Sequence, residues 1–211
     1  RVLFRSQSAS KLFLNRGDWQ FEDVTMKAGI QTERWSSGVT LLDINGDGRT
    51  DIYICNTLSP NPEKTRNNLF INQGNDEKGV PAFKDMAKEY GLDDDGQDSS
   101  AAFFDYDNDG DLDVFLAINL IDRMYPNQYV TRTSDGSEIT RDRLYRNDWS
   151  DSLNHPVYTD VSLKAGIVYD GYSHSVIIND FNKDGWKDIY VCNDYISNDL
   201  LYINNGNGTF T

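Results

Sequence analysis

The stretch formed by residues 105–113 reads Asp-Tyr-Asp-Asn-Asp-Gly-Asp-Leu-Asp, and the chain repeats this pattern twice more. The other copies are residues 43–51 and 180–188, so all three fit Asp-x-(Asp or Asn)-x-Asp-Gly-x-x-Asp. Together the three stretches contain eleven Asp residues. Carboxylates packed this closely repel one another, and the simplest way to hold them together is a bound cation.

Calcium coordination explains each position of these loops. Side chains at positions 1, 3 and 5, the backbone carbonyl at position 7 and the carboxylate at position 9 supply oxygen ligands, while Gly at position 6 permits a sharp turn. Magnesium prefers a tight octahedron with several waters, and zinc prefers His and Cys. We therefore expect about three Ca²⁺ ions, one in each loop. The predicted ligands are Asp43, Asn45, Asp47, the Arg49 carbonyl and Asp51; Asp105, Asp107, Asp109, the Asp111 carbonyl and Asp113; and Asp180, Asn182, Asp184, the Trp186 carbonyl and Asp188.

The segments around the loops repeat as well. A block that ends in Gly29, Gly91 or Gly166 stands 14 residues before the first Asp of each loop. A second block, which starts with Leu and ends with Asn, occurs four times with spacings of 57, 75 and 57 residues. The chain is therefore a tandem repeat of about 60 residues. The expected units are residues 12–68, 69–143 and 144–200, followed by the start of another at 201–211.

Each unit contains four candidate strands. Short β-branched and aromatic segments, such as residues 39–42 and 52–55, flank each acidic loop and predict an antiparallel pair. The Leu-to-Asn block predicts a third strand, and an aromatic residue after a Gly-containing turn opens a fourth. The residues before each block-ending Gly are expected to form a helical turn. Four strands per repeat are typical of a propeller blade, so we expect an all-β protein, a β-propeller of four-stranded antiparallel blades.

Composition excludes several classes of protein. The 211 residues include 34 Asp and Glu but only 20 Lys and Arg, giving a formal charge of −14, whereas nucleic-acid binders carry a basic surface. No apolar run approaches the roughly 20 residues of a membrane span, so we expect neither nucleic-acid binding nor a membrane-spanning chain. Cys55 and Cys192 occupy equivalent positions two repeats apart, too distant for a disulfide, and are predicted to be buried thiols.

These blocks and loops resemble the FG-GAP/VCBS repeat family, and among its members the bacterial cell-surface proteins and the related ASPIC/UnbV proteins. The resemblance covers essentially the whole chain. It implies a calcium-binding propeller, seven-bladed when complete, of which this chain covers about three blades. It also implies an extracellular, outer-membrane or cell-surface location. The remaining blades would come from the same chain or from another, and any membrane anchor would lie outside these residues.

Three features depart from the repeat. The connection formed by residues 119–143 is longer than its counterparts and is predicted to be a loop that contacts a partner. The acidic run of residues 93–95 with Asp98 is expected to be a solvated loop, with a weak extra cation site as the alternative. His155 and His174 are the only histidines, and no nucleophile motif accompanies them, so both are expected to be loop or surface residues.

The sequence therefore predicts a calcium-stabilised module that binds a protein or a glycan outside the cell and is not an enzyme. One alternative is a part of a carbohydrate-active enzyme, a polysaccharide lyase or hydrolase. The other is a structural subunit of a surface assembly with no ligand of its own. The residues do not identify the ligand, the blade number or the oligomeric state.

Overall fold

The computed structural model describes residues 10–120, 133–194 and 197–211, and these residues form four antiparallel sheets joined by short connections. Sheet I holds β1 (Phe13–Asn15) and β2 (Phe21–Asp23). Sheet II holds β3 (Trp35–Leu42), β4 (Asp51–Thr57), β5 (Asn68–Asn75) and β6 (Pro81–Asp85). Sheet III holds β7 (Asp98–Phe104), β8 (Asp113–Ile118), β9 (Arg143–Ser150) and β10 (His155–Asp160). Sheet IV holds β11 (Ser173–Asn179), β12 (Asp188–Asn193) and β13 (Leu200–Tyr202).

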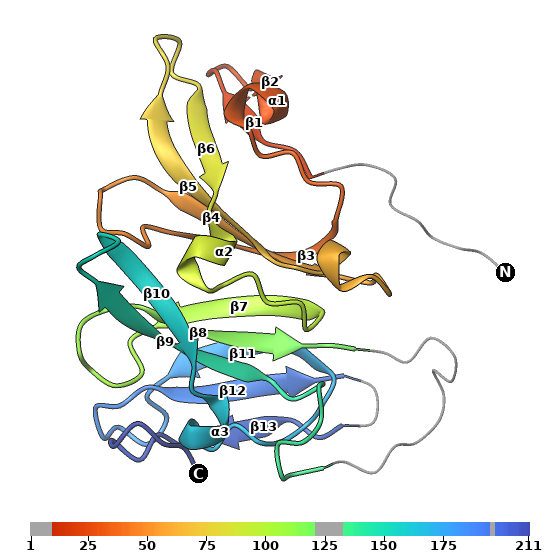
Figure 1. The fold of residues 1–211 in the computed structure, drawn as a ribbon, viewed down its shortest axis with the longest axis vertical. Helices are drawn as coiled ribbons and strands as arrows, with labels where there is room; N and C mark the ends of the chain where they lie inside the picture. The colour runs from red at the N-terminus through yellow and green to blue at the C-terminus, as the bar shows by residue number, and fades with distance from the viewer. Residues whose placement is uncertain (1–9, 121–132, 195–196) are drawn as a thin grey trace, which may run out of the picture.

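The sheets follow one another along the long axis of the molecule in chain order (Figure 1). The predicted four-stranded antiparallel unit is confirmed in sheets II and III, where neighbours in sequence are neighbours in the sheet. Sheet IV has three strands, and a bridge between Asn204 and Phe210 begins the position of a fourth. Sheet I has two strands. The described residues thus form an open row of two complete four-stranded sheets with an incomplete sheet at each end, and no closed ring.

Each unit counted in the sequence straddles two sheets. The unit at residues 12–68, for example, contains β1 and β2 of sheet I followed by β3 and β4 of sheet II. Its first strand, β1, is the counterpart of β5, the third strand of sheet II. A sheet instead begins at its first strand, directly after the helical turn. The sequence repeat and the structural repeat therefore share a period but differ in phase.

The predicted helical turns are present as three one-turn helices, which end at the repeated glycines. These are α1 (Thr25–Ala28), α2 (Ala87–Tyr90) and α3 (Ser162–Ala165), and a 3₁₀ turn, η1 (Pro62–Lys64), lies between β4 and β5. The glycines after α1, α2 and α3 have φ angles of 75°, 73° and 87°, a left-handed conformation that costs little without a Cβ.

Glycine is also required at these positions by a close approach to the next sheet. A Cβ atom there would lie within 3.0 Å of a backbone carbonyl oxygen on the fourth strand of the following sheet or at its position. The pairs are Gly29 with Phe83, Gly91 with Tyr158 and Gly166 with Phe210. The repeated glycine therefore lets the connection of one sheet pack directly against the backbone of its neighbour.

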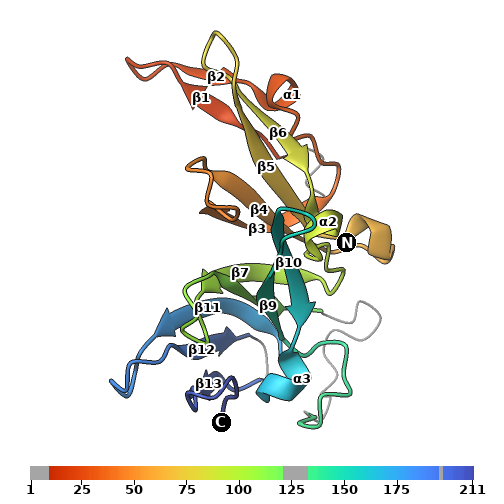
Figure 2. The ribbon, with the colours of Figure 1, turned by 60° about the vertical axis from the view of Figure 1, so that its left-hand side comes forward.

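The first strands of sheets II, III and IV lie side by side in both views, and β7 contacts β3 on one side and β11 on the other (Figures 1 and 2). Each carries a bulge, at Ser37, Ser99 and His174 respectively. The Ser37 hydroxyl donates to the Asp98 carbonyl, and the Ser99 hydroxyl donates to the Ser173 carbonyl at 2.7 Å. The bulges of sheets II and III therefore bind each sheet to the next one.

Three apolar clusters fill the spaces between the sheets. The cluster between sheets II and III includes Tyr53, Leu69, Tyr90 and Leu116, all of them almost completely buried. A second lies between sheets III and IV, and a third lies between sheets I and II. Burial of apolar surface between sheets, rather than within one sheet, supplies the main stabilisation, as expected for stacked repeats.

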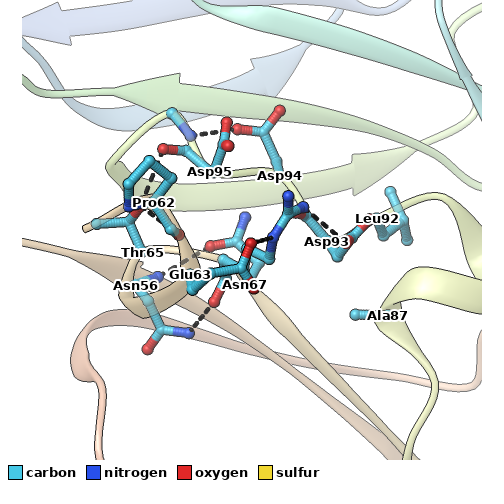
Figure 3. A network of polar contacts seen from close by, with 12 residues as sticks. Asn56, Pro62, Glu63, Thr65, Asn67, Ala87, Leu92, Asp93, Asp94 and Asp95 are labelled. Carbon is cyan, nitrogen blue, oxygen red and sulfur yellow. Dashed lines mark hydrogen bonds and ion pairs between the residues drawn. The ribbon is translucent and has the colours of Figure 1, made fainter. Parts of the chain in front are cut away.

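A polar network accompanies the apolar cluster between sheets II and III (Figure 3). The Asp94 carboxylate, only 7% exposed, accepts hydrogen bonds from Arg143, from the Tyr145 hydroxyl and from the Gly96 amide. The Asp94 carbonyl accepts from the Asn67 amide at 2.8 Å, which ties the loop to sheet II. The solvated loop expected for residues 93–95 and Asp98 is therefore wrong for Asp94 and Asp98, which are buried.

Asp98 is fully buried, and its carboxyl group is only partly satisfied. Its Oδ2 atom accepts from Asn67 Nδ2 at 2.6 Å, whereas its Oδ1 atom has no hydrogen-bond partner. Burial, and then the nearby charge of Asp94, raises the pKa of Asp98 well above its usual range. Asp142 also raises this pKa, and Arg143 lowers it, so the neutral form of the carboxyl group is favoured in the fold.

Removal of the Arg143 guanidinium should strongly destabilise the seam, the packed interface, between sheets II and III. Arg143→Met leaves the buried Asp94 charge without its partner, so we expect a loss of about 3 kcal/mol or more in the free energy of unfolding, measured in urea. Adding Asp94→Asn removes the stranded charge and should recover part of that loss. Arg66→Met is the control, because its ion pair with Asp93 is more exposed and should contribute at most about 1 kcal/mol. Equal losses in the two single variants would contradict the role of the network.

Asp98→Asn should change how stability depends on pH. The raised pKa means that the folded chain holds this proton more tightly than the unfolded chain, so folding stability decreases as pH rises above the ordinary Asp value of 3.8. Asparagine is neutral at every pH, so the variant should be the more stable protein at pH 7–8, and its advantage should shrink toward pH 4. Urea unfolding of both proteins across this range measures the difference, and identical pH slopes would refute it.

Candidate metal centre

The three acidic loops connect the first and second strands of sheets II, III and IV, and all lie on the left-hand side of Figure 1. In each loop the first Asp accepts the backbone N–H groups of positions 5 and 6. In the second loop, the Asp109 and Gly110 amides donate to the two oxygens of Asp105 at 3.2 and 3.0 Å. Equivalent bonds reach Asp43 and Asp180 in the other loops. The first carboxylate thus fixes the turn before any ion is considered.

The Asp at position 9 has a role in the fold that the sequence did not reveal. Its side chain is completely buried in all three loops, and each oxygen accepts one backbone N–H. Asp113 accepts from Tyr106 at 3.0 Å and from Asn147 at 2.8 Å. Asp51 and Asp188 make the same pair of bonds, to position 2 of the loop and to the Asn that ends the Leu-to-Asn block. This carboxylate therefore joins the loop to the third strand of its sheet.

The second loop brings carboxylates closest together. Oxygen atoms of Asp105, Asp107 and Asp109 all lie within 4.8 Å of one another, and no other group of three Asp, Glu, His or Cys side chains does so among the described residues. Asp107 Oδ1 and Asp111 Oδ1 are buried and have no hydrogen-bond partner. A hard cation would supply the positive charge that these oxygens lack, so the residues present fit calcium.

Burial and repulsion make this loop electrostatically unfavourable without an ion. Burial raises the pKa of Asp107, and the charges of Asp109 and Asp105 raise it further. Burial, followed by the charge of Asp109, raises the pKa of Asp111 to about 7. Burial also raises the pKa of Asp113 to about 7, against the effect of its two backbone hydrogen bonds. Without a cation, the carboxylates of this loop therefore hold protons more tightly than ordinary Asp side chains do.

The first and third loops differ because Asn replaces Asp at position 3. The Asn45 and Asn182 amide groups donate to the position-5 carboxylates, Asp47 and Asp184, at 3.3 and 2.7 Å. The Arg49 guanidinium adds an ion pair to Asp47 at 3.3 Å. These donors already neutralise part of the charge that a cation would meet. The second loop is thus the strongest candidate site, and the predicted ligands of all three loops remain predictions.

The other residues that the sequence singled out are placed as follows. The His155 ring stacks on Tyr90 with ring centroids 4.3 Å apart, so it is part of the packing between sheets, whereas His174 is exposed in its bulge. Cys55 is a buried free thiol, and Cys192 is a free thiol that is only half-buried. Of the 119–143 connection, residues 121–132 lie outside the described part of the chain, so its predicted partner contact stays a prediction.

The helices within the described ranges are all too short to cross a membrane.

Comparison with known proteins identifies the repeat. The FG-GAP-like repeat family matches residues 2–54, which include the first acidic loop. Cartilage acidic protein 1 from Homo sapiens is 26% identical over 180 residues, covering 84% of this chain and 23% of that protein. Its counterpart from Mus musculus is 25% identical over 202 residues, covering 95% of this chain and 27% of that protein. The chain spans about a quarter of the length of these relatives, and its resemblance to the FG-GAP-like repeat family is confirmed over residues 2–54.

Proposed function

We propose that this chain is part of a calcium-stabilised β-propeller that acts outside the cell as a module for binding a protein or a glycan. The observation that carries the calcium proposal is the group of Asp105, Asp107 and Asp109 oxygens within 4.8 Å, beside buried carboxylate oxygens that have no partner. Such a group costs free energy when empty and gains it when a cation binds.

Calcium would act here on stability rather than on chemistry. An ion that binds only the folded state stabilises it by about 2.7 kcal/mol when its concentration is a hundred times its dissociation constant. Weak loop sites reach that ratio in the millimolar calcium found outside cells, but not in the cytosol. This is a large share of the 5–15 kcal/mol that typically separates folded from unfolded domains.

The propeller proposal is supported by an exposed apolar face on the side of sheet II that faces the two-stranded sheet I. Val39 and Leu41 on β3 are 67% and 64% exposed. Their counterparts on β7, Ala101 and Phe103, pack against sheet II in the apolar cluster between sheets II and III. Exposed apolar surface where one repeat would pack on the next indicates that a further structural element covers it. We infer that additional blades, from the same chain or another, cover it.

The extracellular location is supported by the relatives. Both are named for cartilage, a tissue made largely of extracellular matrix, and for their acidity, which this chain shares with its charge of −14. A binding role, rather than catalysis, is the simpler use of rigid stacked sheets whose loops are occupied with structural hydrogen bonds.

Calcium should raise the thermal stability of the chain. Addition of millimolar calcium to protein treated with EDTA should increase the melting temperature by about 10 °C, because the ions bind only the folded loops. Magnesium at the same concentration should give a smaller increase. Differential scanning calorimetry measures both, and an unchanged melting temperature on chelation would sink the calcium proposal.

Two substitutions separate the metal role from the fold role of the second loop. Asp109→Asn should abolish most of the calcium-dependent shift while leaving the EDTA-treated protein at least as stable, since it removes charge from the cluster. Asp113→Asn should lower stability even in EDTA by about 1–3 kcal/mol, because it removes one of two buried acceptors. Asp18→Asn, at an exposed turn, is the matched control and should change neither quantity. Identical behaviour of the Asp109 and Asp113 variants would contradict this division.

A further inference from the structure

A cavity of about 270 Å³ lies between sheets III and IV, beside the second acidic loop. Its wall includes Tyr106 and Asp107 from that loop, Arg146 from β9 and Lys164 from α3. Sheet IV closes it with Trp186 and with the turn at residues 206–209. A concave space between two sheets, with aromatic groups and a few polar groups that converge on it, is a candidate site for a small ligand.

The wall of this cavity carries several hydrogen-bond donors that bind no other residue in the described part of the chain and are open to solvent or a ligand. Arg146 donates from Nε and Nη2 to Asp148, at 2.9 and 2.8 Å, and its Nη1 atom binds no described residue. The Lys164 ammonium group, the Trp186 indole N–H and the Tyr106 hydroxyl also make no hydrogen bond with any described residue. Four donors of this kind, two of them cationic, favour a ligand that is anionic and rich in oxygen acceptors.

The equivalent place between sheets II and III shows that the repeat itself does not require these donors. There Ile71, which is buried, occupies the position of Arg146, and Glu89 occupies the position of Lys164. Asp111 stands where sheet IV has Trp186. The cavity between sheets I and II also has cations in its wall, Arg16, Lys27 and Lys78, but it includes three acidic residues, whereas the wall between sheets III and IV includes one. Arg146 has no cationic counterpart, since Leu14 and Ile71 occupy its position in the other units, so the fold does not require a cation there.

The geometry points to a binding site for a uronic acid residue of an acidic glycan in this cavity. Arg146 and Lys164 suit the carboxylate of the sugar, since charged donors form the strongest hydrogen bonds to carboxylates. The neutral donors of Trp186 and Tyr106 suit its hydroxyl and ring oxygens. An acidic peptide side chain would satisfy only the charged donors and would leave the indole and phenol groups unpaired.

The Asp107 carboxylate is the one acidic group in this wall, and it belongs to the cluster assigned to calcium. The inference therefore rests on the proposed function, because an ion in the second loop would offset the charge that otherwise opposes an anionic ligand. Trp186 is used through its side chain, which packs on the turn at Gly206, where a Cβ would lie 2.8 Å from the indole Nε1 atom. The role of the Trp186 side chain in the cavity is thus separate from that of its backbone carbonyl, which is the predicted calcium ligand.

Isothermal titration calorimetry of the chain in millimolar calcium tests this site with trigalacturonate as the probe. We expect binding of trigalacturonate, and none of the neutral trisaccharide maltotriose. Arg146→Ile, which installs the residue found at position 71, and Lys164→Glu, which installs the residue found at position 89, should each weaken binding roughly tenfold to a hundredfold. Lys84→Glu makes the same charge change at an exposed site on β6 and should leave the affinity unchanged.

Two further measurements keep this result distinct from the calcium proposal. The calcium-dependent melting shift of Arg146→Ile should equal that of the wild type, which shows that the variant is folded and the loop intact. A normal calcium shift without trigalacturonate binding overturns the glycan site alone. Equal affinity in wild type and Arg146→Ile, or equally tight binding of a glutamate tripeptide, also overturns it. Absence of any calcium shift refutes the proposed function, and in that case trigalacturonate binding that Arg146→Ile weakens would still support the cavity.

Discussion

The structure depends on a buried carboxylate at the end of each acidic loop. Asp51, Asp113 and Asp188 are removed from water completely, and each compensates for that loss by accepting two backbone N–H groups. One N–H comes from the loop and the other from an Asn in the third strand or just after it, so a single side chain fixes three segments of its sheet. The remaining carboxylates are then held at the mouth of the same loop. Their mutual repulsion is what makes a cation the natural partner of this fold.

The sheets are joined by contacts that repeat and by contacts that do not. A left-handed Gly packs against a neighbouring carbonyl in each seam, and the bulged Ser37 and Ser99 donate across the two seams that join sheets II, III and IV. Between sheets II and III a buried network around Asp94 and Arg143 fills the seam. Between sheets III and IV the corresponding space holds a cavity whose donors are not used by other described residues. A repeat scaffold of this kind keeps its backbone contacts fixed and leaves side chains free to differ between seams.

This division links the stability of the chain to its proposed ligand site. The wall of the cavity includes residues of the second and third acidic loops, so an ion that orders the second loop would also set the position of Tyr106 and Asp107. Binding and calcium would then be coupled through shared residues rather than through a distant conformational change. Rigid sheets that carry a site in the seam between them require little rearrangement when a ligand enters.

The sequence by itself determined the period, the strands, the helical turns ending in Gly and the three acidic loops, because each of these is specified by neighbouring residues within one unit. It did not determine the phase of the sheets, because a period has no marked beginning. Only the tertiary structure decided that Asp94 and Asp98 are buried, since Arg143 reaches Asp94 from 49 residues further along the chain. It alone also placed Arg146, Lys164 and Trp186 around one cavity, because their positions are set by packing between different sheets, which no local pattern encodes.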